Sequence, residues 1–262
     1  MRLILGIETE SLMREHFDLI MDIGELMLVC GAEVHRVEDS IKRMCSSLDV
    51  ERTDVFIIIS SMVVTVHNAD KAFTQTRRIK SIGTDIEKLH MLNELSRKIC
   101  SDCLSAEEIR SRLEKIRKTK SYPLWVEMLS YMLITGGFAV FFGGNFFDAI
   151  TALVIGATLR FIILALEKIS INKIFEKLLC SFIVSCLAFV AMKAGIISTI
   201  DKVMIGNVMV LIPGIGLTNA IRDLFVGDSV SGLLRLIEAT LMALAVAAGY
   251  FLFVFLLGGI AV

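Results

Sequence analysis

Apolar residues dominate the second half of the chain, in long runs separated by short polar or glycine-rich joints. A membrane-spanning helix needs about 20 mostly apolar residues, and five stretches after Pro123 satisfy that requirement. The predicted spans cover residues 124–142, 147–166, 177–195, 203–221 and 236–257. The pattern therefore predicts an α-helical integral membrane domain of five transmembrane helices over residues 123–262.

The first half has the shorter, mixed pattern of a small α+β domain. Apolar residues recur at helical steps over residues 10–30, and Gly31 is placed to end that helix. A second helical stripe follows in GAEVHRVEDSIKRMCSSL, and then TDVFIIISSMVVTVH and AFTQTRRI predict an antiparallel meander of about three strands. Helices over residues 84–100 and 105–118 close the predicted domain, which covers residues 1–122. Ser105 and Glu108 have the spacing of a capping box at the start of the second of these helices.

Charge divides the chain in the same place. Nineteen of the 27 basic residues precede Pro123, and the mean hydropathy of +0.72 is too high for a soluble domain of this size. Six basic residues lie in RSRLEKIRKTKSY before the first span, whereas the joints expected on the opposite side contain only Lys193 and Lys202. The positive-inside rule therefore predicts a multi-pass protein of the cytoplasmic membrane, with the α+β domain cytoplasmic and the C-terminus outside.

The N-terminal residues do not read as a signal peptide. Residues 3–7 are too short for its apolar core, and Glu8 and Glu10 follow at once. Targeting is therefore expected to come from the internal apolar segments.

The sequence contains no catalytic motif that we recognise. It lacks a phosphate-binding loop, a nucleophile elbow and zinc-ligand spacing, and its four histidines are far apart. CSDC at residues 100–103 is a lone CxxC, for which reduced thiols are the simpler interpretation and a metal or redox site is the alternative. We expect no catalytic residue, no metal, no cofactor and no nucleic-acid partner.

The fourth predicted span is interrupted in LIPGIGLTNAIRDLFVGDSVSG. Proline cannot donate to the carbonyl one turn earlier, at Met209, and glycine weakens a helix further. Transporters use such broken helices to hold substrates and ions, although a structural kink is an alternative. Neutral hydrogen-bonding groups follow the break, and an Arg-Asp pair marks its cytoplasmic exit. The candidate substrate-pathway residues of this segment are Pro213, Gly214, Gly216, Thr218, Asn219, Arg222 and Asp223.

Further charged residues lie within or beside the predicted spans. Arg160 stands twelve residues beyond Asp148 inside the second span. It either snorkels towards the cytoplasm or faces an anionic substrate or a carboxylate partner. Glu127 is near the cytoplasmic end of the first span, where a structural role is expected, and Glu238 is spaced to pair with Arg235.

A charged row also follows one face of the helix after Gly31. Glu33, Arg36, Ser40 and Arg43 recur at helical steps there. The row is either a solvated helix side or a polar surface that contacts the membrane half or a partner chain.

Three segments together resemble the threonine/serine exporter family: GAEVHRVEDSI, TRRI with DIEKLHMLNELSRKI, and LIPGIGLTNAIRDLFVGDSVSGLLRLIEA. The resemblance runs from Leu12 to the C-terminus and is to the larger, YjjP-like subunit of the two-component branch. It implies secondary export of small polar metabolites, and a small YjjB-like membrane subunit as an obligate partner within the lipid bilayer. It also marks a motif in the cytoplasmic domain, formed by Gly31, Glu33, Arg36, Glu38 and Asp39.

The cargo that the resemblance implies is either threonine and serine or succinate and similar dicarboxylates. The split architecture favours a C4 dicarboxylate, and Arg160 and the helix end near Pro213 would suit a carboxylate in both cases. A threonine/serine exporter subunit and a non-transporting regulatory or assembly subunit are the alternatives, and a higher oligomer is compatible with each. A membrane-anchored enzyme is disfavoured because the sequence offers no nucleophile–base set.

Overall fold

The chain folds into two compact units. The computed structural model describes residues 2–48, 50–68, 71–102, 104–119, 122–169, 171–197 and 199–257. The first unit comprises Met1–Lys120 and Asn219–Arg235, and the second comprises Ser121–Thr218 and Leu236–Val262. The first unit thus includes Asn219–Arg235, and the domain bounds of 1–122 and 123–262 stay a prediction.

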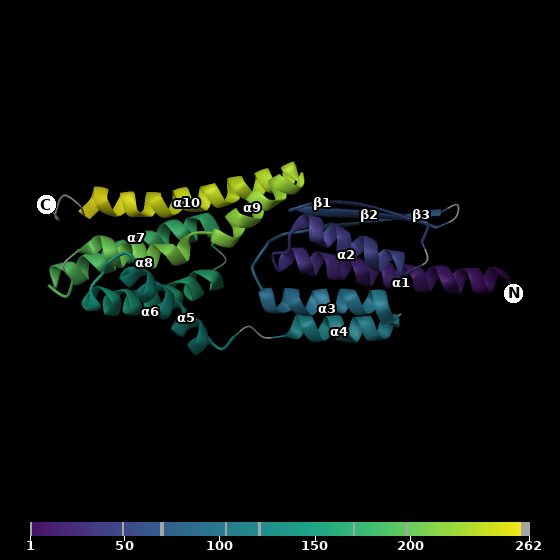
Figure 1. Ribbon diagram of the computed structural model, residues 1–262, viewed down its shortest axis with the longest axis horizontal. Helices are drawn as coiled ribbons and strands as arrows, with labels where there is room; N and C mark the ends of the chain where they lie inside the picture. The colour runs from purple at the N-terminus through teal and green to yellow at the C-terminus, as the bar shows by residue number, and fades with distance from the viewer. Residues whose placement is uncertain are drawn as a thin grey trace. The chain divides into compact units, whose positions relative to one another are not determined.

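Four helices and a three-stranded sheet make up most of the first unit, in three layers (Figure 1). The sheet lies on one side of the α1/α2 pair, and the α3/α4 pair lies on the other. The elements are α1 (Arg2–Val29), α2 (Val34–Ser46), β1 (Arg52–Ile58), β2 (Ser61–Asn68), β3 (Lys71–Arg78), α3 (Ile86–Asp102) and α4 (Ala106–Lys118).

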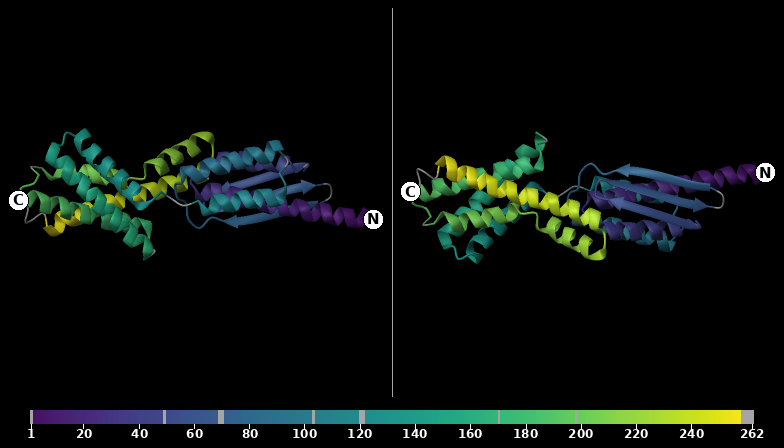
Figure 2. Two further views of the ribbon diagram at one scale, coloured as in Figure 1. Left: turned by 90° about the horizontal axis from the view of Figure 1, so that it is seen from below. Right: turned by 90° about the horizontal axis from the view of Figure 1, so that it is seen from above.

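The predicted antiparallel meander is confirmed, with strand order β1-β2-β3 (Figure 2). Along β2 the side chains of Met62, Val64 and Val66 are buried and alternate with partly exposed neighbours. This period of two directs one face of the sheet onto the helices. The predicted capping box of α4 is also present, because Ser105 accepts from the Glu108 N–H and Glu108 accepts from the Ser105 N–H.

Gly31 ends α1 as predicted, although the helix begins earlier than expected, at Arg2. The Ala32 N–H donates to the Met27 carbonyl over 3.0 Å and the Gly31 N–H to the Leu28 carbonyl over 3.0 Å, which is the Schellman pattern. Gly31 has φ 91°, and a Cβ there would lie 2.6 Å from the Gly83 carbonyl oxygen. Both the conformation and the space require glycine.

The second unit is helical throughout the part that the structure describes. It contains α5 (Leu124–Phe141), α6 (Phe146–Lys168), α7 (Lys173–Lys193) and α8 (Ile200–Leu211), with parts of α9 (Gly214–Val226) and α10 (Ser229–Leu257). Four helices, α5, α6, α7 and α10, are long and apolar enough to cross a membrane, and α8 with α9 form a fifth candidate that is bent by 53°. The predicted five spans are therefore present if the bent pair is one span.

Small residues bring the helices of the second unit together. A Cβ on Gly206 would lie 2.6 Å from the Thr135 carbonyl oxygen, and one on Gly156 would overlap the Thr135 side chain. Thr135 Oγ1 also donates to the Ala152 carbonyl over 2.9 Å. Close backbone approach and inter-helix hydroxyl bonds are typical of packing within a membrane.

Candidate functional site

α9 and α10 form a tight helical hairpin around Gly227. Gly227 has φ 105°, and the Asp228 N–H donates to the Asp223 carbonyl over 2.9 Å. A Cβ on Gly232 would lie 2.8 Å from the Leu224 nitrogen, so the two helices touch there. Residues 222–235, expected as a polar joint between spans, are instead helical apart from this turn. A glycine able to adopt positive φ makes so short a reversal possible.

The hairpin holds the turn that follows α1. Arg235 Nη2 donates to the Ala32 carbonyl over 2.9 Å, and Asn219 Nδ2 donates to the Gly31 carbonyl over 3.4 Å. Arg222 forms an ion pair with Glu33. These two carbonyls lie in the turn between α1 and α2, and the hairpin supplies a side-chain donor to each of them. Gly31, Ala32 and Glu33 therefore form one polar site with Asn219, Arg222 and Arg235, all within the first unit.

A buried ion pair lies at the centre of this site. The Asp223 side chain is 2% exposed and that of Arg235 is 6% exposed, with Nε and Oδ2 3.4 Å apart. Neither of these two atoms has a hydrogen bond. The expected pairing of Arg235 with Glu238 is wrong, because the guanidinium turns towards Asp223 and the Ala32 carbonyl, where burial makes a partner more necessary.

The remaining residues of the Gly31–Asp39 motif point in different directions. Glu38 Oε1 accepts from the Ile57 N–H over 3.2 Å, and burial, helped by the Asp228 carboxylate, raises the pKa of Glu38. Arg36 Nε lies 3.5 Å from Glu33 Oε2, and Asp39 Oδ2 lies 3.7 Å from His35 Nε2. Within the charged row, Glu33 thus contacts α9, whereas Arg36 and Arg43 are exposed. Glu38, which lies outside that row, contacts β1.

Arg160 is held by carboxylates of the second unit. Its Nε and Nη2 donate to Glu127 Oε2 over 2.9 and 2.5 Å, and its Nη1 donates to Glu167 Oε1 over 3.4 Å. The guanidinium carbon lies 5.7 Å from the centre of the Tyr131 ring. Of the alternatives considered from the sequence, the structure has the carboxylate partner, supplied by α5.

The break at Pro213 is present as predicted. α8 ends at Leu211, Ile212 is extended at φ −73° and ψ 130°, and α9 begins at Gly214. Thr218 is exposed, and its Oγ1 donates to the Gly214 carbonyl over 3.0 Å. A Cβ on Gly214 would meet nothing within 4 Å, and one on Gly216 only Pro213. Among the described residues no second helix approaches these glycines, which act on the backbone alone.

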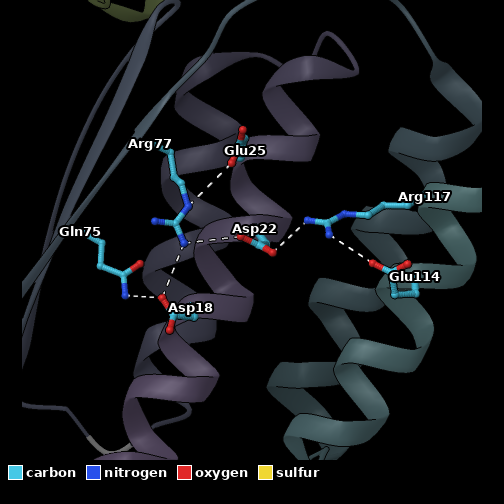
Figure 3. Close-up of polar contacts among 7 residues, drawn as sticks. All are labelled: Asp18, Asp22, Glu25, Gln75, Arg77, Glu114 and Arg117. Atoms are coloured by element: carbon cyan, nitrogen blue, oxygen red, sulfur yellow. Dashed lines mark hydrogen bonds and ion pairs between the residues drawn. The ribbon is translucent and has the colours of Figure 1, made fainter.

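A second polar cluster in the first unit has its charges paired. Figure 3 shows three acidic side chains of α1 between an arginine of β3 and an arginine of α4. Arg77 lies 3.5 Å from Asp22 Oδ1, and Arg117 donates to the other oxygen of Asp22 over 2.9 Å. The cluster consists of Asp18, Asp22, Glu25, Gln75, Arg77, Glu114 and Arg117. We interpret it as a structural link between α1, β3 and α4.

No metal centre is formed by the residues that the structure describes, since no three potential ligands come together there. Cys100 lies in α3 with a free thiol. Cys103, the second cysteine of the CxxC, lies outside the described residues.

The comparisons with known proteins agree on one family. Residues 18–257 match the family model described as "Putative threonine/serine exporter". The "Probable succinate transporter subunit YjjP" of Escherichia coli K12 is 23% identical over 235 residues, which is 88% of this chain and 90% of that protein. The "Probable threonine/serine exporter" of Mycobacterium tuberculosis is 22% identical over 244 residues, which is 90% of this chain and 45% of that protein.

A fungal relative is much longer. The "Pheromone-regulated membrane protein 10" of Yarrowia lipolytica is 22% identical over 248 residues, which is 92% of this chain and 20% of that protein. The chain thus spans a fifth of this relative and less than half of the mycobacterial one. No solved structure matches the chain. Because the family model covers nearly the whole sequence, the chain belongs to the threonine/serine exporter family, whose members are membrane transporters and not enzymes.

Proposed function

We propose that the chain is a subunit of a secondary transporter that exports small carboxylate metabolites across the cytoplasmic membrane, with a C4 dicarboxylate such as succinate as its cargo. The main support for this proposal is the match of nearly the whole chain to the threonine/serine exporter family. The break between α8 and α9 agrees with it, because transporters use broken spans. The cargo is supported by length, since the chain spans 90% of the Escherichia coli relative described as a succinate transporter subunit but 45% of the mycobacterial threonine/serine exporter.

The proposed pathway is built on the break between α8 and α9. The first N–H groups of a helix have no intrahelical acceptor, and the helix dipole favours negative charge there. Gly214 starts α9 in open space, so a substrate carboxylate can approach this backbone. Thr218 adds a hydroxyl one turn later, and Arg160 is a cation that a substrate carboxylate can compete for against Glu127.

Asn219, Arg222 and Asp223 have a different proposed role from the one first expected. Their contacts lie with Gly31, Glu33 and Arg235. We assign them, with the Gly31–Asp39 motif, to linking the α+β domain to the helix that follows the break, at its cytoplasmic end. This role requires the first unit to face the cytoplasm and the C-terminus to lie outside, as the distribution of basic residues predicts.

The proposal includes a small YjjB-like membrane subunit as partner. The apolar window of α5 is only 17% buried within the chain, against 39% for α6 and α7. Phe138 and Phe141 of α5 are exposed and in edge-to-face contact with each other. An apolar helix with so little cover needs lipid or another subunit, and we assign part of this surface to the partner subunit.

The test is counterflow in proteoliposomes that contain the chain with and without its partner, using labelled succinate and labelled threonine. We expect succinate uptake by the pair and none by the chain alone. Threonine uptake in place of succinate would support the amino-acid exporter that the mycobacterial relative suggests. Uptake of neither would support a regulatory or assembly subunit, and uptake by the chain alone would contradict an obligate pair.

A further inference from the structure

A cavity of about 450 Å³ opens between α2 and α3 of the first unit. This volume is within the range of small-molecule sites. Its lining has three guanidinium groups, those of Arg36, Arg43 and Arg97, and one carboxylate, that of Asp39. The charged lining therefore has a net charge of about +2 at neutral pH.

Two of these arginines have no side-chain partner among the described residues. Arg43 and Arg97 have no hydrogen bond or ion pair within the part of the chain that the structure describes. Arg36 has only the 3.5 Å contact with Glu33, and its side chain is 74% exposed. The three serines of the lining donate elsewhere, Ser40 to the Arg36 carbonyl, Ser96 to the Asn93 carbonyl and Ser101 to the Asp102 carboxylate. The donors left to a ligand are the guanidinium groups, the Asn93 amide and the weak donor of the Cys100 thiol.

We propose that this cavity binds a small dianion whose charge is carried on oxygen, that is, a dicarboxylate or a phosphate. Arginine is suited to such a ligand because its planar donors match two oxygens of one carboxylate or phosphate group. Two negative charges balance the lining, and the volume accommodates a group larger than a single carboxylate.

Glu33 connects this cavity to the hairpin site. Its carboxylate contacts Arg36 on one side and Arg222 of α9 on the other. An anion that draws Arg36 into the cavity leaves Glu33 to Arg222 alone, which strengthens the link between the turn after α1 and the helix that follows the break. If the chain is a subunit of an exporter, as proposed above, the bound dianion regulates transport. This consequence therefore rests on the proposed function.

The test is isothermal titration of the purified full chain in detergent with succinate, inorganic phosphate and threonine. Hydrogen bonds to charged groups contribute about 1.5–3 kcal/mol each, so Arg43→Gln and Arg97→Gln are each expected to weaken dianion binding about tenfold or more. Arg78→Gln is the matched control, because Arg78 is an exposed arginine of β3 outside the cavity. Arg43→Lys with Arg97→Lys keeps the charge and should bind with intermediate affinity.

Succinate or phosphate binding that depends on Arg43 and Arg97 supports the proposal. The anion that binds with the higher affinity identifies the ligand class as a dicarboxylate or a phosphate. The proposal is overturned if neither anion binds, if threonine binds equally well, or if the two glutamine variants bind like Arg78→Gln. Succinate binding that is insensitive to these arginines belongs to the transport pathway and leaves the export proposal intact. Binding that depends on Arg43 and Arg97, together with a lack of counterflow by the subunit pair, supports the dianion cavity and contradicts the export proposal. Matching melting temperatures of the variants exclude misfolding.

Discussion

The buried ion pair between Asp223 and Arg235 allows a quantitative test of the hairpin site. Arg235→Met removes the cation but leaves the Asp223 carboxylate at 2% exposure. It also removes the donor to the Ala32 carbonyl. Removing one partner of a buried pair costs about 3–5 kcal/mol because an uncompensated charge stays behind. We expect the hairpin to separate from the turn after α1 correspondingly more often.

Thiol labelling measures this opening. Ser231 lies in the first turn of α10 and is 2% exposed, so a Ser231→Cys probe, with the six native cysteines replaced, reacts only when the hairpin opens. A loss of about 3–5 kcal/mol raises the open population, and with it the labelling rate, by about 10² to 10⁴ fold. Arg222→Met is the control, because Arg222 is 50% exposed. Its partner Glu33 is 17% exposed, so solvent screens the pair in part and its loss should cost less than loss of the buried pair, at about 1 kcal/mol or about fivefold.

A double variant separates the charge from the packing. Asp223→Leu with Arg235→Met removes both charges, which is often neutral for stability. The double variant should therefore label more slowly than Arg235→Met, with a residual increase from the missing Ala32 hydrogen bond, whose donor is charged, of about 10- to 10²-fold. The reasoning is refuted if Arg235→Met labels no faster than Arg222→Met, or if the double variant labels as fast as Arg235→Met.

Three further predictions concern the first unit. Gly31→Ala should lower the thermal stability by about 1–3 kcal/mol, because alanine is strained at φ 91° and its Cβ would meet the Gly83 carbonyl; an unchanged melting temperature would argue against this turn. Ser105→Ala should cost about 1 kcal/mol in the same assay through loss of the α4 cap, and Ser105→Asn should restore it. Burial raises the pKa of Cys45 from 9.0 to about 12, so only the unfolded thiol ionises between these values and stability should fall with rising pH there. Cys45→Ala should flatten that slope in pH-dependent unfolding curves.

Local elements could be predicted from the sequence because their signals lie within a few residues. The alternation along β2, the Ser105–Glu108 box and the proline at 213 each determine backbone geometry near themselves. Helix ends were predicted less well. α1 and α10 both begin earlier than expected, because each helix continues through a glycine, Gly6 or Gly232, that precedes its expected apolar stripe.

Distant pairings could not be predicted in this way. Glu33 and Arg222 are 189 positions apart, and no periodicity links them. The family resemblance marks both motifs but does not indicate that they touch. The cavity between α2 and α3 was missed for the same reason. Arg43 was noted as part of a charged row, but Arg97 belongs to another helix and has no local signal that distinguishes it from a surface residue.

The proposed function requires transport through the break between α8 and α9. Pro213→Ala restores the missing donor, and proline disfavours a continuous helix by about 3 kcal/mol, so the variant should shift the population towards an unbroken helix by about 10² fold. Ile212→Ala, at the exposed neighbouring position, is the control. The deciding measurement is the initial rate of labelled-succinate counterflow by the subunit pair. We expect Pro213→Ala to lose most of that rate and Ile212→Ala to stay close to wild type. An undiminished rate in Pro213→Ala would contradict transport through the break.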